Sequence, residues 1–292
     1  MSHQNCRIAV VTGASRGVGK GIAIALGGAG MTVYVTGRSD TESLVCLRGQ
    51  RLPGTLAETA DAVTRAGGKG IAVPCDHRDD VQVRELFARV EREQGRLDLL
   101  VNNAIQLHEN LIDPGPFWNK PVELVDLLDV GLRSSYIASY YAAPLLLRTG
   151  RGLIAFTSSY GGGCYMHGPA YGAQKAGADK MAADMAVDFE NTGVATVSLW
   201  LGPQCTERSA IAAVARPDTY AKVMESAETP EFNGCVILAL LDDPQLAERS
   251  GQTLISAELA RNYGITERNG RQPPSYRQML GAPHSLHPAR VI

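Results

Sequence analysis

Two hydrophobic patterns alternate along this chain. Short runs that are apolar at almost every position recur, and longer stretches with apolar residues at helical spacing lie between them. Runs of the first kind are buried on both faces when they form strands, which is typical of a parallel sheet covered by helices on both sides. The pattern predicts strands at residues 8–12, 32–36, 70–74, 97–102, 153–157, 194–200 and 252–256.

Helices are predicted in the intervening stretches. Thr55 and Glu58 have the spacing of a capping box at one helix start. We therefore expect a single α/β domain spanning residues 1–292, with a Rossmann-type, doubly wound parallel sheet of about seven strands and helices on both faces. The helical stretches are residues 19–28, 55–66, 81–93, 121–147, 170–191 and 230–241.

Three segments fit neither pattern. Residues 39–53 and 203–229 are unusually long connections after predicted strands, and residues 261–292 form a C-terminal extension without a clear period. Open α/β sheets bind their ligands beside the carboxyl ends of the strands, where these connections begin. We therefore predict that residues 203–229 form a lid over a substrate.

Charge and composition exclude several other classes of protein. The chain has 28 Lys and Arg against 30 Asp and Glu, so we expect no binding to nucleic acid or to an anionic membrane surface. No apolar run approaches the roughly 18 residues of a spanning helix, and the first residues lack the basic and apolar regions of a secretory signal. The cysteines form no CxxC pair, and His284 and His287 lack further ligands, so we expect a cytoplasmic protein without a metal site.

A glycine-rich loop joins the first predicted strand to the first predicted helix. Small residues there let the backbone approach a pyrophosphate, and the free amides of the helix start bind its charge. A tight turn with incidental glycines is the alternative, which the position between strand and helix disfavours. The loop reads TGASRGVG at 12–19, and its predicted cofactor contacts are Gly13, Ser15, Arg16, Gly17, Val18 and Gly19.

The second predicted strand is followed by Gly37 and Arg38, where NAD enzymes usually place an acid. A guanidinium cannot accept a hydrogen bond from ribose hydroxyls, but it can pair with a 2′-phosphate. Arg16 lies close enough in sequence to help. We therefore expect NADP(H) rather than NAD(H) as cofactor, with Arg38 as a solvated loop residue being the alternative.

Tyr171 and Lys175 lie four residues apart in a predicted helix and therefore share one of its faces. A neighbouring cation favours the phenolate and lowers the pKa of a tyrosine toward the range where a general acid works best. This pair alone is a weak signal, because such spacings are common on helix surfaces. Ser158, 13 residues before the tyrosine at the end of a predicted strand, adds a hydroxyl that can bind a carbonyl oxygen.

The motifs of this chain, and the order in which they occur along it, resemble those of the short-chain dehydrogenase/reductase family. Further phrases, VGLRSSY at 130–136 and LARNYG at 259–264 among them, resemble one subfamily and extend the match almost to the C-terminus. The matching pieces are the glycine loop, Asp76 after the third strand, NNA at 102–104, Ser158, YGAQK at 171–175, and Gly202 with Thr206 after the sixth strand.

The resemblance implies a role for each of these residues. Tyr171 would protonate the carbonyl oxygen as hydride arrives, Lys175 would hold the nicotinamide ribose, and Ser158 would orient the carbonyl. The resemblance also implies a homodimer or homotetramer, formed through the helices near residues 122–147 and 170–191. The remaining cofactor contacts would be Asp76 at the adenine, Asn103 and Ala104 along the cofactor backbone, and Gly202 and Thr206 at the carboxamide.

Three positions depart from the family's pattern. Gly131 stands where a helix asparagine is usual, Ile105 where a glycine follows NNA, and Gln204 where an aliphatic residue is usual. The proton relay and the carboxamide contacts therefore stay open. Aromatic and thioether residues in the expected pocket loops predict a hydrophobic substrate, and they are Phe117, Trp118, Tyr160, Tyr165, Met166 and His167.

The sequence thus predicts an NADP(H)-dependent oxidoreductase that interconverts a carbonyl and an alcohol by hydride transfer. The alternative is a cofactor-binding sensor or scaffold with little or no turnover, which Gly131 and the altered loops motivate. An isomerase or dehydratase that uses the cofactor transiently is a second alternative. The spacing from Ser158 to Tyr171 and the spacing of the loop glycines disfavour it.

Overall fold

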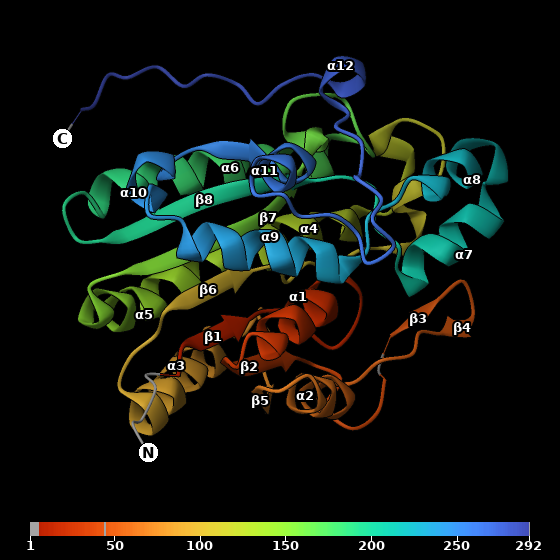
Figure 1. The fold of residues 1–292 in the computed structure, drawn as a ribbon. Helices are drawn as coiled ribbons and strands as arrows, with labels where there is room; N and C mark the ends of the chain where they lie inside the picture. The colour runs from red at the N-terminus through yellow and green to blue at the C-terminus, as the bar shows by residue number, and fades with distance from the viewer. Residues whose placement is uncertain (1–5, 44, 292) are drawn as a thin grey trace.

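The computed structural model describes residues 6–43 and 45–291, so the N-terminal residues that lack a signal pattern lie outside the described part. Its centre is a seven-stranded parallel sheet with the order β5-β2-β1-β6-β7-β8-β9 (Figure 1). The strands are β1 (Ile8–Val11), β2 (Thr32–Gly37), β5 (Lys69–Pro74), β6 (Leu99–Asn102), β7 (Gly152–Ser159), β8 (Val194–Leu201) and β9 (Thr253–Ile255).

The chain begins at the middle of the sheet and winds outward in both directions. It runs from β1 through β2 to the edge strand β5, returns to β6 on the other side of β1, and then continues to β9. The reversal between β1 and β6 leaves a crevice at the carboxyl ends of the strands, where doubly wound sheets bind ligands. The predicted fold class is therefore confirmed.

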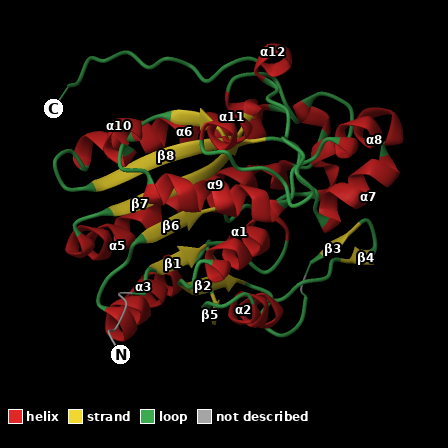
Figure 2. Ribbon diagram, viewed as in Figure 1, coloured by secondary structure: helices red, strands yellow, loops and turns green. Residues whose placement is uncertain are grey.

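Helices cover both faces of the sheet (Figure 2). Val10 and Val11 of β1 belong to different halves of the core, because successive residues of a strand point to opposite faces. One half packs against α1 (Gly17–Gly28), α2 (Leu56–Arg65) and α9 (Pro230–Asp242). The other packs against α3 (Asp80–Gln94), α5 (Ser134–Thr149) and α6 (Pro169–Asp188).

The predicted capping box at the start of α2 is confirmed. The Glu58 amide donates to Thr55 Oγ1 over 3.1 Å, and the Thr55 amide donates to Glu58 Oε2 over 3.2 Å. Each bond satisfies an amide that has no partner inside the helix. A side-chain cap of this kind stabilises a helix by about 1 kcal/mol.

Both long connections contain structure that the sequence pattern did not indicate. Residues 39–53 include a small hairpin of β3 (Cys46–Leu47) and β4 (Gln50–Arg51), and the predicted lid contains α7 (Glu207–Ala215) and α8 (Pro217–Glu225). Hairpin and lid lie at the same end of the molecule, at the right of Figure 1.

The single helix predicted at residues 121–147 is broken. A 3-10 turn (Val122–Val125) and the short α4 (Asp126–Leu128) lead into a π-helical segment (Asp129–Arg133), and only then does α5 begin. Such π segments appear often at functional sites. The smaller elements are the 3-10 turns Glu109–Ile112, Phe117–Asn119 and Tyr160–Gly162, and the helices α10 (Leu246–Arg249), α11 (Ser256–Asn262) and α12 (Arg277–Leu280).

The C-terminal extension crosses the base of the lid. Tyr276 donates its amide to the Tyr160 hydroxyl over 3.0 Å, and its own hydroxyl lies 2.7 Å from Ser226 Oγ. Arg271 donates to the carbonyl oxygens of Ser226 and Ala227. The extension therefore holds the end of α8 against the sheet. Within residues 6–43 and 45–291, no helix is both long and apolar enough to span a membrane.

Candidate active site

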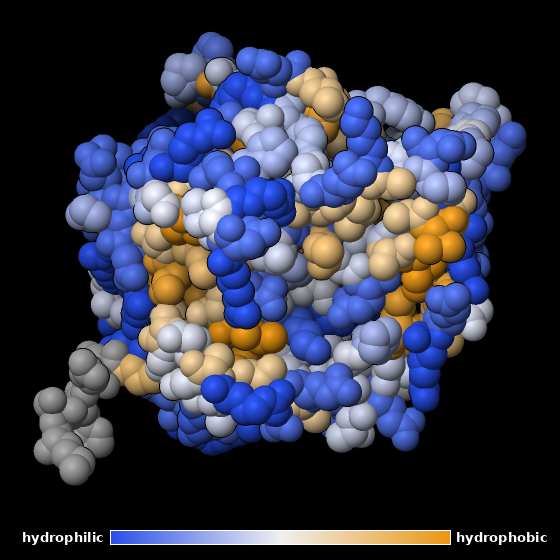
Figure 3. All heavy atoms as spheres, turned by 45° about the vertical axis from the view of Figure 1, so that its right-hand side comes forward, coloured by the Kyte–Doolittle hydropathy of each residue, from blue (hydrophilic) through white to orange (hydrophobic). Residues whose placement is uncertain are grey.

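One cavity of about 1250 Å³ opens at the carboxyl ends of the strands, between the glycine loop, the lid and the C-terminal extension. Figure 3, which turns this end of the molecule forward, shows a surface of mixed hydrophilic and apolar side chains. The structure brings all the predicted site residues to this cavity. They are Gly13, Ser15, Arg16, Gly17, Val18, Gly19, Arg38, Asp76, Asn103, Ala104, Ser158, Tyr171, Lys175, Gly202 and Thr206.

The glycine loop packs directly on the end of β6. Gly13 has a φ of +65°, and a Cβ there would lie 2.7 Å from Ala104 Cα. Asn103 Nδ2 donates to the carbonyl oxygens of Thr12 and Gly13, over 2.8 and 3.1 Å. Asn103 and Ala104 therefore line the cavity and also hold the loop in shape.

The start of α1 fits the pyrophosphate of a dinucleotide. Arg16 occupies the N-cap position, yet no side chain in the described part of the chain caps the helix, and its first turn contains no acid. The first-turn amides are therefore available to a phosphate, which the helix dipole also favours. Thr206 of the lid lies close above, because a Cβ at Gly17 would be 3.5 Å from Thr206 Cγ2.

The two cations expected near a 2′-phosphate have different surroundings. Arg16 is anchored on the 39–54 connection, where Nη2 donates to Ser43 Oγ over 2.9 Å and to the Gly54 carbonyl over 2.7 Å. Arg38 donates to Gln106 Oε1 over 2.7 Å, a single neutral acceptor. Both guanidiniums line the cavity beyond the end of β2.

The candidate catalytic group joins the end of β7 to the first turns of α6. The hydroxyls of Ser159 and Tyr171 lie 2.9 Å apart. Lys175 Nζ donates to the Thr157 carbonyl over 3.1 Å and lies 5.4 Å from the centre of the Tyr171 ring. A hydroxyl pair and an ammonium therefore meet beside the glycine loop.

The prediction for Ser158 needs a correction. Its hydroxyl donates to the Lys175 carbonyl over 3.3 Å, and the residue is buried. Adjacent strand residues point to opposite sides, so only one of the two serines can face Tyr171. β7 continues through Ser159, two residues beyond the predicted end. The neighbouring residue, which sequence reasoning missed, therefore supplies the hydroxyl beside the tyrosine.

Burial dominates the pKa values of the tyrosine and the lysine. It raises the pKa of Tyr171 above its ordinary value, and the hydrogen bond from Ser159 opposes this shift only in part. Burial also lowers the pKa of Lys175 to about 8, with the charge of Asp179 acting in the opposite direction. The expected lowering of the Tyr171 pKa is therefore wrong for this structure, in which Lys175 Nζ is directed to Thr157.

A glutamine fills the space beside Gly131. A Cβ at Gly131 would lie 2.8 Å from Gln174 Cγ, and Gln174 Nε2 donates to the Gly131 carbonyl over 2.9 Å. The buried Gln174 Oε1 has no hydrogen-bond partner within the described residues. An amide side chain thus occupies this place from α6 rather than from the π segment. This residue is the glutamine of YGAQK, directly before Lys175.

A buried carboxyl group organises the loop after β8. Glu228 Oε2 accepts from the Gly202 amide, Gln204 Nε2 and Asn233 Nδ2 over 3.1, 2.7 and 3.0 Å. Burial raises the pKa of Glu228 to about 7, although these donors oppose the shift. Its other oxygen has no partner in the described part of the chain, which suits a protonated carboxyl. Gln204, the unusual residue of this loop, therefore belongs to the support of the loop.

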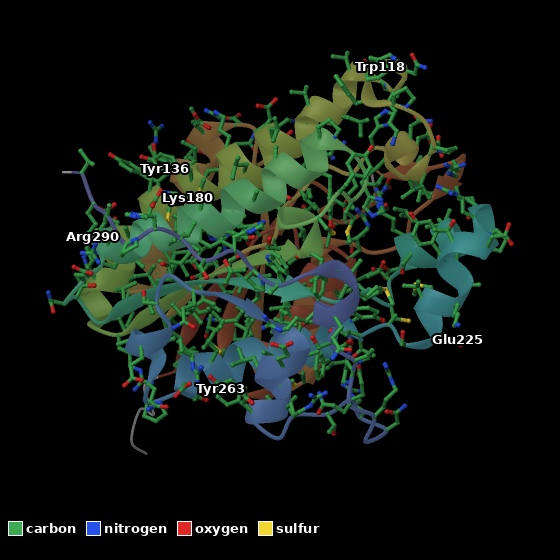
Figure 4. The ribbon with its side chains drawn as sticks, turned by 90° about the horizontal axis from the view of Figure 1, so that it is seen from above. Trp118, Tyr136, Lys180, Glu225, Tyr263 and Arg290 are labelled. Atoms are coloured by element: carbon green, nitrogen blue, oxygen red, sulfur yellow. The ribbon has the colours of Figure 1, made fainter. Side chains whose placement is uncertain are left out.

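The substrate side of the cavity is only partly as predicted. Phe117 and Trp118 are 59% and 71% exposed and do not line the cavity, and Trp118 lies at the outer tip in Figure 4. The His167 ring meets the Tyr171 ring edge-on with centres 5.1 Å apart. Apolar residues missed by sequence reasoning come from the lid and the C-terminal extension, and they are Tyr220, Val223, Met224, Tyr276, Met279 and Leu280.

Solved structures of dehydrogenases share this fold. A short chain dehydrogenase from Mycobacterium thermoresistibile superposes with a TM-score of 0.72 and 23% identity, covering 92% of both chains. A short-chain type dehydrogenase/reductase from Mycobacterium marinum gives a TM-score of 0.70 and 23% identity, covering 85% of this chain and 93% of its own.

Closer likeness appears in sequence. "Dehydrogenase/reductase SDR family member 1" of Mus musculus is 41% identical over 282 residues, which are 92% of this chain and 86% of that protein. The Homo sapiens protein of the same name is 39% identical over 284 residues, which are 93% of this chain and 86% of that protein. The short chain dehydrogenase family model matches residues 7–213. The chain therefore belongs to the short-chain dehydrogenase/reductase family of oxidoreductases.

Proposed function

We propose that this protein is an NADP(H)-dependent oxidoreductase that interconverts a carbonyl group and an alcohol. The observation that carries the proposal is the contact of 2.9 Å between the Ser159 and Tyr171 hydroxyls, in the cavity that also contains the uncapped start of α1. A positioned hydroxyl pair can bind a carbonyl oxygen and protonate it.

In this proposal Tyr171, Ser159 and Lys175 each have a separate role in the reaction. The bound nicotinamide would supply or accept the hydride. Tyr171 gives its proton to the substrate oxygen, and Ser159 holds that oxygen with a second hydrogen bond. Lys175, whose pKa burial lowers to about 8, lies 5.4 Å from the centre of the Tyr171 ring and would hold the nicotinamide ribose.

The preference for NADP(H) rests on the cations beyond β2. Within the described residues Arg38 donates to one neutral partner, Gln106, and Arg16 lies nearby on the same wall. A 2′-phosphate would therefore meet two positive charges there. The preferred substrate is a hydrophobic carbonyl compound. Val223, Met224 and Leu280 support this, because they add apolar groups to the lining of the cavity.

A homodimer or homotetramer is part of the proposal. Tyr136 and Tyr140 on α5 are 52% and 63% exposed, and Val122 is 80% exposed. Tyr136 lies on the same outer side as Lys180 of α6 (Figure 4). Exposed aromatic and aliphatic groups on neighbouring helices favour burial against a second copy. Light scattering on the purified protein tests this part.

The experiment is oxidation of NADPH and NADH in the presence of ketones, diketones, quinones and aldehydes, with Tyr171→Phe as the matched variant. We expect turnover that prefers NADPH and disappears in the variant, while NADPH binding stays intact. Equal rates in the variant and the parent would remove Tyr171 from the mechanism. Cofactor binding without turnover across the whole panel would instead favour the sensor alternative.

A further inference from the structure

Arg208 differs from Arg16 and Arg38, the other two cations considered in the cavity wall, in its hydrogen bonding. It lies in the first turn of the lid helix α7, lines the cavity and is partly buried. No hydrogen bond or ion pair joins its guanidinium to any residue in the described part of the chain. In contrast, Arg16 donates to the 39–54 connection, and Arg38 donates to Gln106.

No carboxylate in the described part of the chain forms an ion pair with Arg208, and the charge that acts on it is that of another cation, Arg16. Burial lowers the pKa of Arg208, and the nearby charge of Arg16 lowers it further. The charges of Glu207 and Glu58, by comparison, act on Arg16 and favour its charged form. A guanidinium nevertheless stays protonated in proteins. A partly buried cation without a partner is costly, so this position favours an anionic ligand.

The position of α7 indicates which anion. Thr206 caps α7, and its methyl group would lie 3.5 Å from a Cβ at Gly17 in the glycine loop. The capping box of Thr206 and Ser209 provides hydrogen-bond partners for backbone amides at the start of α7. The start of α1 has no side-chain cap. An anion bound at α1 therefore lies beneath the first turn of α7.

We infer that Arg208 binds a phosphate oxygen of the dinucleotide's pyrophosphate and thereby ties the lid to the bound cofactor. This inference rests on the proposed function, because it requires that a dinucleotide binds. A 2′-phosphate is the other source of the same anionic chemistry. Arg38, which follows β2 on the other side of the glycine loop, is the better candidate for that group.

The test is direct binding of NADPH and NADH, followed by cofactor fluorescence, to the unmodified protein, Arg208→Met and Lys222→Met. Lys222 is an exposed residue of α8 that does not line the cavity, so its variant removes the same charge from the same lid. A charged hydrogen bond to phosphate predicts that Arg208→Met weakens both cofactors equally, by about tenfold to a hundredfold. Lys222→Met should leave both affinities unchanged.

Each other outcome overturns part of the assignment. Unchanged affinity for both cofactors in a folded Arg208→Met protein would remove Arg208 from the cofactor site while leaving the proposed function standing. Weakening of NADPH alone would assign Arg208 to the 2′-phosphate and contradict the pyrophosphate contact. Binding of neither cofactor by the unmodified protein would overturn the proposed function together with this inference. Melting temperatures of the three proteins establish that the variants are folded.

Discussion

The two sides of the cavity are built in different ways. On the proposed cofactor side, the contacts come from the sheet itself, because the glycine loop after β1 rests on Asn103 and Ala104 at the end of the neighbouring strand β6. On the proposed substrate side, the lid is held by a segment outside the sheet, with Tyr276 and Arg271 of the C-terminal extension bonded to Ser226. The difference shows that the sheet alone shapes one side of the cavity, whereas the other side also needs the lid and the C-terminal extension.

Polar groups also differ between the two sides. The cofactor side leaves the amides at the start of α1 without side-chain caps, ready for a phosphate. The loop after β8, which leads into the lid, is instead closed by Glu228, which accepts from Gly202, Gln204 and Asn233. Changes on the first side should therefore affect ligand binding, and changes at Glu228 should affect stability and its dependence on pH.

The largest expected effect is a loss of turnover on substitution of Tyr171, which lies where the two sides meet. Tyr171→Phe removes the proposed acid and keeps the ring that packs beside His167. General acid catalysis contributes about 10²–10⁴-fold to a rate, so turnover should fall by that factor. NADPH affinity should change little, and a comparison of steady-state rates with a binding titration checks both. A loss of NADPH affinity as large as the loss of turnover would mean that the variant disturbs the cofactor side too.

Glu228 should make stability fall as pH rises. Burial raises its pKa to about 7 in the folded protein, from an ordinary value of 4.5. Between these two pH values the unfolded chain ionises while the folded protein keeps its proton, so the free energy of unfolding decreases across that window. The decrease attributable to this group is at most about 3 kcal/mol.

Glu228→Gln tests this directly, because the amide cannot ionise. Urea unfolding of the parent and the variant at pH 5 and pH 7.5 should show a smaller loss of stability in the variant on going to the higher pH. The difference between the two proteins isolates Glu228 from other titrating groups. Parallel losses in both proteins would show that Glu228 does not titrate in this range.

The Gly131–Gln174 contact should make a glycine-to-alanine substitution lower the free energy of unfolding, although this substitution usually raises it inside a helix. Glycine to alanine inside a helix is usually favourable by about 1 kcal/mol. At Gly131, however, the added carbon would lie 2.8 Å from Gln174 Cγ, and overpacking costs about 1–3 kcal/mol. Gly131→Ala should therefore destabilise the protein, as measured by urea unfolding.

A second substitution identifies the cause. In the background of Gln174→Ala the crowding is gone, so Gly131→Ala should become neutral or stabilising. The four proteins of this double-mutant cycle give the coupling between the two positions. Additive effects of the two substitutions would mean that Gln174 does not determine the tolerance at Gly131.

The smallest expected effect is a modest rise in KM on substitution of Tyr276, on the proposed substrate side. Tyr276→Phe removes the hydroxyl that lies 2.7 Å from Ser226 Oγ and keeps the ring in its cluster with Tyr160. One neutral hydrogen bond contributes about 0.5–1.5 kcal/mol. With a hydrophobic substrate, KM should rise modestly while NADPH affinity stays the same. A change in NADPH affinity instead would show that the lid base and the cofactor side are coupled.

Most of the fold follows from local patterns in the sequence. Continuous apolar runs predict buried strands, and the glycine loop with Thr55 and Glu58 predicts where helices begin. The lid helices were not predicted, and neither α7 nor α8 contains a buried residue, so neither belongs to the core that the apolar pattern reports. Local pattern therefore predicts the cofactor side better than the substrate side.

The errors within the site have physical causes of the same kind. Two adjacent serines cannot be told apart by composition, and the choice between Ser158 and Ser159 depends on where β7 ends. The partnership of Gln174 with Gly131 joins residues 43 positions apart, which no local pattern indicates. The pKa of Tyr171 depends on burial, which spacing along a helix does not reveal.

The most direct test of the central claim compares two neighbouring serines. Turnover with NADPH is measured for Ser159→Ala and Ser158→Ala, using a carbonyl compound that the parent protein reduces. Since losing one positioned donor costs about 10²–10³-fold, Ser159→Ala should lose activity by that factor, while Ser158→Ala should keep most of it. The reverse order, with Ser158→Ala inactive and Ser159→Ala active, would contradict the catalytic group proposed for this protein.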